Sequence, residues 1–195
     1  MELSPKEAAK RIEHLEALLA HRDAEVAELR LSLEVFSSID TRTGLPNLNA
    51  VVDALLAAVD VLRRHGEAFS VIGVRFPKLS EAATVESVRH LGAVVEAALR
   101  EIDRVGILSP ESFIAIARDC DDTGAAALIE RLGSALGAGQ VPEGVETPMY
   151  SSMSMEKSGE IRPDIVIDRV RRSLDRETPI QVVRLDPAID VEGDE

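Results

Sequence analysis

The sequence has very little cysteine, few aromatic residues and a shortage of positive charge. Its one cysteine, Cys120, allows no intrachain disulfide and no cysteine-based zinc site, so we expect the protein to work in the reducing cytoplasm. Only 3% of the residues are aromatic although 45% are hydrophobic, so a folded core has to be aliphatic and rich in alanine. The net charge of −13 disfavours nucleic acid as a partner, because nucleic-acid affinity depends on clustered Lys and Arg.

The sequence also lacks any apolar run long enough to cross a bilayer, and its first residues lack the pattern of a secretory signal. We therefore expect no membrane insertion. The four histidines are scattered along the chain, which predicts no metal site built from them. A length of 195 residues suffices for one domain with a real core and an appendage.

Apolar residues near the N-terminus recur at alternating steps of three and four. Apart from Arg22, which interrupts the series, they are Ile12, Leu15, Leu19, Val26, Leu29, Leu33 and Phe36. This heptad seam predicts a helix from about Pro5 to Ser38 that forms a parallel homodimer through residues 12–36. An antiparallel hairpin partner, or contact with the chain's own domain, is the alternative.

The rest of the chain alternates between helical and extended patterns. We expect helices at about 48–64, 81–100, 122–136 and 163–174, and strands at 69–76, 105–108, 113–117, 149–155 and 179–185. Because the second and third strands are joined by a tight turn at Ser109 and Pro110, the expected fold class is α+β, with a mixed central sheet and helices packed on it. The predicted divisions are a coiled coil at 1–38, a domain at 39–186 and an acidic, disordered tail at 187–195.

The predicted coiled coil leads into a motif that breaks one helix and starts another, Asp40-Thr-Arg-Thr-Gly-Leu-Pro-Asn47. A coiled coil followed by Asp-x-x-Thr-Gly-Leu-Pro-Asn resembles the start of a GGDEF domain, the palm-like fold of diguanylate cyclases. The resemblance covers about residues 40–186 and includes the element order and Phe113, which matches the phenylalanine that closes the family's signature hairpin. The chain departs from the family at Arg42 and Leu48.

The five-residue signature of the family is degenerate here, because the aligned residues are Ser109, Pro110, Glu111, Ser112 and Phe113. Pro110 replaces a glycine, adding a ring and removing an N–H donor. Ser112 stands where the family has a metal-binding Glu, and Gly73-Val74-Arg75 stands where it has an Asp-x-Asp metal pattern. Since phosphoryl transfer from GTP needs cations, the resemblance implies a protein without catalytic residues, metal site or cofactor. Glu111 is interpreted as a solvated turn residue.

The resemblance also implies a binding site for cyclic di-GMP. The family's product-inhibition site has an Arg-x-x-Asp five residues before the signature, and Arg100 to Asp103 stand at that offset. A further family arginine, on the helix after the hairpin, matches Arg131. Arginine can grip a guanine edge or a phosphate with paired hydrogen bonds, and a carboxylate can accept from guanine N–H groups. Arg100, Asp103 and Arg131 are therefore the candidate ligand-binding residues.

Two other interpretations stay open at this point. Arg100 could cap a helix C-terminus and form an ordinary surface pair with Asp103, with Arg131 on a polar helix face. The Arg-x-x-Asp pattern also begins at Arg118 and at Arg172. Only its position relative to the signature therefore favours the copy at Arg100. The protein would then be a ligand-free dimerisation module that regulates a protein partner, such as an active cyclase. An active cyclase with altered metal chemistry rests on fold analogy alone.

Overall fold

The computed structural model describes residues 5–40, 43–79, 84–137, 141–142, 144–156, 161–175 and 182–185. For residues 5–9, 29–36 and 182–185 it describes the backbone alone. The chain divides into two compact units, Met1–Ser37 and Ser38–Glu195. No helix of the described residues is long and apolar enough to cross a bilayer.

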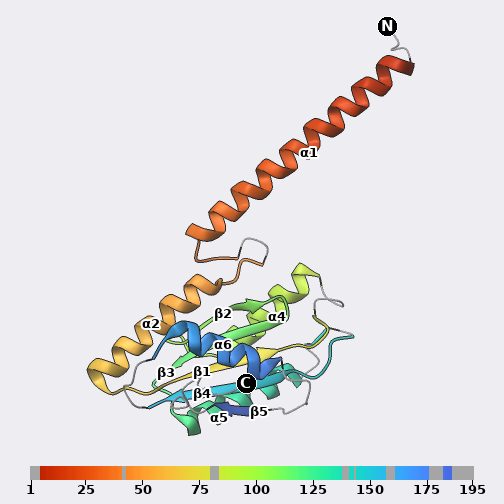
Figure 1. Ribbon diagram of the computed structural model, residues 1–195. Helices are drawn as coiled ribbons and strands as arrows, with labels where there is room; N and C mark the ends of the chain where they lie inside the picture. Colours follow the sequence, from red (N-terminus) through yellow and green to blue (C-terminus); the bar gives the residue numbers. More distant parts are fainter. Residues whose placement is uncertain are drawn as a thin grey trace, which may run out of the picture. The chain divides into compact units, whose positions relative to one another are not determined.

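The first unit is a single helix, α1 (Pro5–Phe36), drawn in red and orange in Figure 1. The predicted helix is thereby confirmed, and it ends two residues earlier than expected. Its described seam side chains are exposed: Ile12 by 56%, Leu15 by 48%, Leu19 by 62% and Val26 by 44%. The side chains of Leu29, Leu33 and Phe36 lie outside the described residues. Dimerisation through this seam stays a prediction.

The second unit is built on a five-stranded sheet in the order β2-β3-β1-β4-β5. Its strands are β1 (Phe69–Arg75), β2 (Arg104–Ser109), β3 (Ser112–Arg118), β4 (Met149–Met155) and β5 (Val182–Leu185). β1 is antiparallel to both β3 and β4, β2 is antiparallel to β3, and β4 is parallel to β5. The predicted mixed sheet is confirmed. β1 lies at its centre and is buried at every residue except the last.

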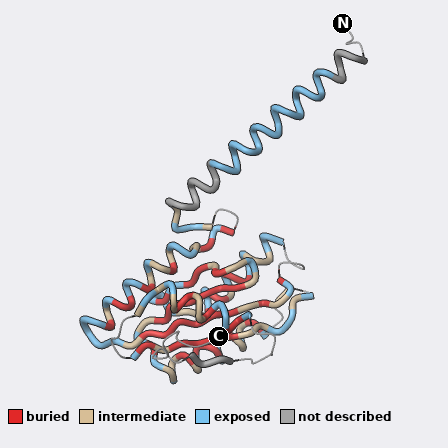
Figure 2. The backbone as a smooth tube through the Cα atoms, in the orientation of Figure 1, coloured by how far each residue is buried: buried red, intermediate tan, exposed pale blue. Residues whose placement is uncertain are grey.

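Helices cover both faces of this sheet. They are α2 (Leu48–His65), α4 (Val85–Ala97), α5 (Asp122–Gly137) and α6 (Pro163–Leu174). Successive residues of β1 point to opposite faces, so Val71 joins the core beneath α2 and α6 while Ile72 joins the core beneath α4 and α5. Figure 2 shows the buried residues along the strands and on one side of each of these helices.

The described residues of the Asp40–Asn47 motif, Asp40 and residues 43–47, are joined by hydrogen bonds at the start of the domain. Asp40 Oδ1 accepts hydrogen bonds from the Thr43 backbone N–H (2.8 Å) and from its hydroxyl (2.7 Å). Leu45 is buried against Gly92 of α4, which has no Cβ in the space that the leucine fills. As predicted, Asn47 caps α2, because its side chain accepts from the backbone N–H of Ala50.

The helix predicted at 81–100 is shorter than expected. α4 begins at Val85, where the Thr84 side chain caps it, and ends at Ala97. Arg100 therefore lies beyond the helix, and the prediction that it sits in the last helical turn is wrong. Strand β4 and helix α6 have the predicted bounds. The start predicted at 81, the first part of the strand predicted at 179 and the tail at 187–195 lie outside the described residues.

Candidate functional site

Residues 109–113, which the resemblance aligns with the family's signature, form the turn between β2 and β3, and the end of β1 lies beside it. Arg75 of β1 is in register with Ser112 of β3. The backbone N–H of Phe76 donates to the carbonyl oxygen of Glu111 at 2.8 Å, which ties the turn to β1. The rings of Phe76 and Phe113 meet edge to face, with centroids 5.8 Å apart. The turn is thus held on its inner side by two buried aromatic residues.

Arg75 links this turn to the end of α6. Its Nη2 donates to Glu111 Oε2 at 3.3 Å, and its Nη1 donates to Asp175 Oδ1 at 3.1 Å and to the Leu174 carbonyl at 3.0 Å. The side chains of Arg75 and Glu111 are only 27% and 18% exposed. The interpretation of Glu111 as a solvated turn residue is therefore wrong, because it is the partly buried anion of an ion pair.

A divalent cation does not fit where the resemblance places the family's metal ligands. The guanidinium of Arg75 stands there and repels a cation, while the nearby Glu111 is already paired. Gly73 has no side chain, and a Cβ there would lie 2.6 Å from Val170 Cγ1 of α6. Among the described residues, no group of three or more His, Cys, Asp or Glu is placed to hold a metal ion.

The role of Arg75 could not be predicted from the resemblance, which gives this position only as part of a metal-binding pattern. The partner residue Asp175 is 100 positions away, and nothing local connects the two. One signal was present in the sequence. Arg75 stands where the family's Asp-x-Asp pattern has an acidic residue, while Glu111 in the turn between β2 and β3 keeps its negative charge. Such an exchange of signs predicts a new ion pair.

Asp103 is a buried residue of the loop between α4 and β2, with 6% of its surface exposed. Its Oδ2 accepts from the backbone N–H of Arg100 (2.9 Å), and its Oδ1 accepts from the backbone N–H of Arg118 (3.1 Å). The alternative of a surface ion pair between Arg100 and Asp103 is therefore wrong. The carboxylate instead fastens the loop after α4 to the end of β3.

Arg131 reaches the same loop from α5. Its Nε donates to the carbonyl oxygen of Ala98 at 2.6 Å, at the end of α4, where helix carbonyls favour a cation. Arg100 follows two residues later and is exposed. Beside them, burial raises the pKa of the Cys120 thiol, and the Arg100 charge opposes this in part. The structure thus brings all three predicted residues to one loop, with Asp103 inside it and both arginines at its surface.

No family model matches the sequence, and no curated protein is significantly similar to it in sequence. Solved structures match the fold. The GGDEF domain of FimX from Pseudomonas aeruginosa has a TM-score of 0.63 and 16% identity, over 76% of this chain and 99% of that one. The coiled coil and GGDEF domain of DgcB from Caulobacter crescentus, in complex with c-di-GMP, has a TM-score of 0.60 and 19% identity, over 88% and 99%.

Diguanylate cyclase SiaD of Pseudomonas aeruginosa, in complex with its activator SiaC, has a TM-score of 0.59 and 19% identity, over 92% of this chain and 73% of that one. Identities this low carry a likeness of fold alone. The α+β fold expected from the Asp40–Asn47 motif and the element order is confirmed. The chain has the fold of a GGDEF domain, preceded by a long helix.

Proposed function

We propose that this protein is a cytoplasmic signalling protein with a GGDEF fold that has lost cyclase activity, dimerises through α1 and binds cyclic di-GMP at Arg100 and Arg131. The observation that carries the binding proposal is that both exposed arginines belong to the surroundings of the loop after α4, in a chain whose net charge is −13. Arg100 lies in that loop, and Arg131 Nε donates to the Ala98 carbonyl at its start. The solved DgcB structure of the same fold contains c-di-GMP.

The lost activity is supported by Arg75. Its guanidinium forms an ion pair with the Glu111 carboxylate. It also lies where cations would have to neutralise the phosphates of GTP in a cyclase. Ser112 contributes a hydroxyl in place of a carboxylate. The rigid ring of Pro110 occupies the turn that glycines leave open in the family.

The two arginines and the aspartate have different roles in this proposal. Arg100 and Arg131 each present donors that match a phosphate or the O6 and N7 atoms of guanine. Each oxygen of Asp103 already accepts one backbone N–H inside the protein, and the residue is 6% exposed. We therefore propose Asp103 as the positioning residue of the site, which fixes the backbone of Arg100.

Isothermal titration calorimetry tests the binding proposal. Cyclic di-GMP is expected to bind with a micromolar Kd, or about −8 kcal/mol. Arg100→Ala and Arg131→Ala are each expected to weaken binding by about tenfold or more, because a hydrogen bond to a charged partner is worth roughly 1.5–3 kcal/mol. Unfolding curves of both variants would show that the domain remains folded.

Arg172→Ala is the matched control. Arg172 also belongs to an Arg-x-x-Asp pattern, but it lies on α6, is 68% exposed and pairs with Asp168, so its removal should leave binding unchanged. Absence of heat at millimolar ligand, or equal affinity of Arg100→Ala and the unaltered protein, would refute the site. Formation of cyclic di-GMP from GTP and Mg²⁺ by the unaltered protein would refute the loss of activity.

A second candidate function is a dimeric interaction module without a nucleotide ligand, favoured by the exposed apolar seam of α1. Light scattering at micromolar concentration should give a dimer. Leu19→Lys should weaken that dimer by at least about tenfold, since burying a leucine contributes roughly 1.5–3 kcal/mol and a charge in the seam is costly. Leu18→Lys is the control, because Leu18 is 45% exposed and lies outside the heptad series.

A monomeric unaltered protein would contradict both functions. A protein partner that is retained by Arg100→Ala but lost by Leu19→Lys would favour the interaction module over the cyclic di-GMP receptor. The SiaD structure, which contains that protein's activator SiaC, shows a GGDEF fold with a protein bound.

A further inference from the structure

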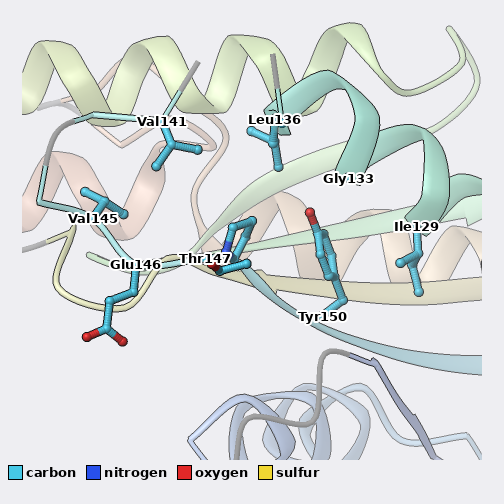
Figure 3. Close-up of a pocket in the computed structure, with 10 residues that line it drawn as sticks. Ile129, Gly133, Leu136, Val141, Val145, Glu146, Thr147 and Tyr150 are labelled. Carbon is cyan, nitrogen blue, oxygen red and sulfur yellow. The ribbon is translucent and has the colours of Figure 1, made fainter. Parts of the chain in front are cut away.

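A pocket of about 460 Å³ lies between α5, the segment that precedes β4 and the first part of β4 (Figure 3). This volume is in the range of small-molecule sites. Arg75, Arg100 and Arg131 are not among its lining residues. Most of its lining side chains are apolar, among them Ile129, Leu136, Val141, Val145 and Pro148.

Tyr150 carries a polar group into this apolar surrounding. The residue is 7% exposed, and its hydroxyl has no hydrogen-bond partner within the part of the chain that the structure describes. In Figure 3 the ring rises from β4 with its hydroxyl toward Gly133 of α5, where an added Cβ would lie 3.9 Å from the hydroxyl oxygen. A buried hydroxyl without a partner destabilises a protein, so this one needs an explanation.

The charges of the lining residues limit which ligands could accept a hydrogen bond from the Tyr150 hydroxyl. Burial raises the pKa of Tyr150 to about 12, so the hydroxyl is a neutral donor at physiological pH. Glu146, the charged residue of the described lining, pairs with Lys78 at 2.5 Å and is half exposed at the rim. An anionic ligand would find no cation among the described lining residues.

We propose that this pocket binds a compact, neutral and mainly apolar molecule with one ether or carbonyl oxygen, which accepts a hydrogen bond from the Tyr150 hydroxyl. The aliphatic lining would bury the body of the ligand, and the hydroxyl would fix its orientation. Because the hydroxyl lies beneath the surface of the pocket, binding also requires a small displacement of the side chains that cover it. This site goes beyond the proposed cyclic di-GMP receptor and does not depend on it.

The bicyclic ether cineole is a suitable probe, and the same bicyclic skeleton with CH₂ in place of oxygen is its reference. Tyr150 is the one tyrosine of a chain without tryptophan, so the near-ultraviolet tyrosine band reports on this site. Cineole is expected to shift that band saturably and to move the methyl NMR signals of Ile129 and Val145. In Tyr150→Phe, the preference for cineole over the hydrocarbon should fall about tenfold, because the hydrogen bond is gone.

Two further measurements make the proposal falsifiable. In the absence of ligand, Tyr150→Phe should be more stable than the unaltered protein, because the substitution removes a buried hydroxyl without a hydrogen-bond partner. Its equilibrium constant for unfolding should be at least about fivefold lower. Gly133→Ala should weaken the binding of cineole by filling the space beside the hydroxyl. No saturable shift up to the solubility of cineole, an unchanged preference in Tyr150→Phe, or a destabilised Tyr150→Phe would each overturn the proposal. Cyclic di-GMP binding should be unaffected by both variants.

Discussion

Gly73→Asp is expected to unfold the domain or destabilise it by more than about 4 kcal/mol, instead of restoring a metal ligand. A Cβ at this position would lie 2.6 Å from Val170 Cγ1, 2.7 Å from Ser151 Oγ and 2.8 Å from Leu174 Cδ1. Val170 and Leu174 are fully buried in the contact between α6 and the sheet. The helix would have to move away from β1 to admit even a methyl group.

The magnitude follows from two separate costs. Overpacking a close-packed core by one small group costs about 1–3 kcal/mol, which is the loss expected for Gly73→Ala. A carboxylate buried among Val170, Leu174 and the Ser151 hydroxyl, with no cation beside it in these contacts, adds several kcal/mol, or takes up a proton and loses its charge. Since a domain is stable by only about 5–15 kcal/mol, the sum removes much of its stability.

Urea unfolding followed by circular dichroism would measure these losses. Gly137→Ala is the matched control, because an added Cβ there meets no atom of the described residues within 4 Å. Its stability should equal or slightly exceed that of the unaltered protein, since alanine favours a helix over glycine by about 1 kcal/mol at most. A Gly73→Asp variant as stable as the unaltered protein would show that α6 does not seal this position.

Asp103→Ala is expected to destabilise the domain by about 3–5 kcal/mol, because it leaves two backbone N–H groups without their charged acceptor. These are the N–H groups of Arg100 and Arg118, at 2.9 and 3.1 Å from the carboxylate oxygens. Asp103→Asn should lose less, because its amide oxygen can still accept one of the two bonds. Thermal unfolding would give the order of stability of the three proteins.

Amide hydrogen exchange adds a local readout to this second prediction. The amide protons of Arg100 and Arg118 should exchange much faster in Asp103→Ala, because their acceptor is gone. Asp53→Asn serves as a control, since Asp53 is exposed on α2 and its change should alter stability by less than about 0.5 kcal/mol. Unchanged protection of both amides would mean that Asp103 does not hold this loop.

Local signals in the sequence predicted much of the fold. The cap at Asn47, the hairpin, strand β4 and helix α6 each depend on residues within a few positions of one another. The end of α4 was predicted too late because helix-forming residues continue past Ala97, whereas the buried Asp103 carboxylate draws the Arg100 N–H into a turn. That competition is decided by burial, which the sequence does not display.

The sequence predicted the residues of the candidate site but not their contacts. The offset from the signature singled out Arg100 and Asp103, and the match on the helix after the hairpin singled out Arg131. Neither signal showed that the Asp103 carboxylate bonds inward to the backbone, or that Arg131 Nε donates to the Ala98 carbonyl. Two features were not predicted, namely the pairing of Arg75 with Glu111 and Asp175, and the buried hydroxyl of Tyr150. Each depends on contacts between elements far apart in the sequence.

The close contact of α6 with β1 at Gly73 also bears on how this protein can evolve. A carboxylate could be accommodated at position 73 of the strand only after smaller side chains had replaced Val170 and Leu174, and each of those replacements alone would open a cavity in the core. Every intermediate sequence would therefore be less stable than the present one. In its descendants, an acidic residue at this position lies behind several destabilising steps, so mutation is expected to alter the exposed side chains of the domain first.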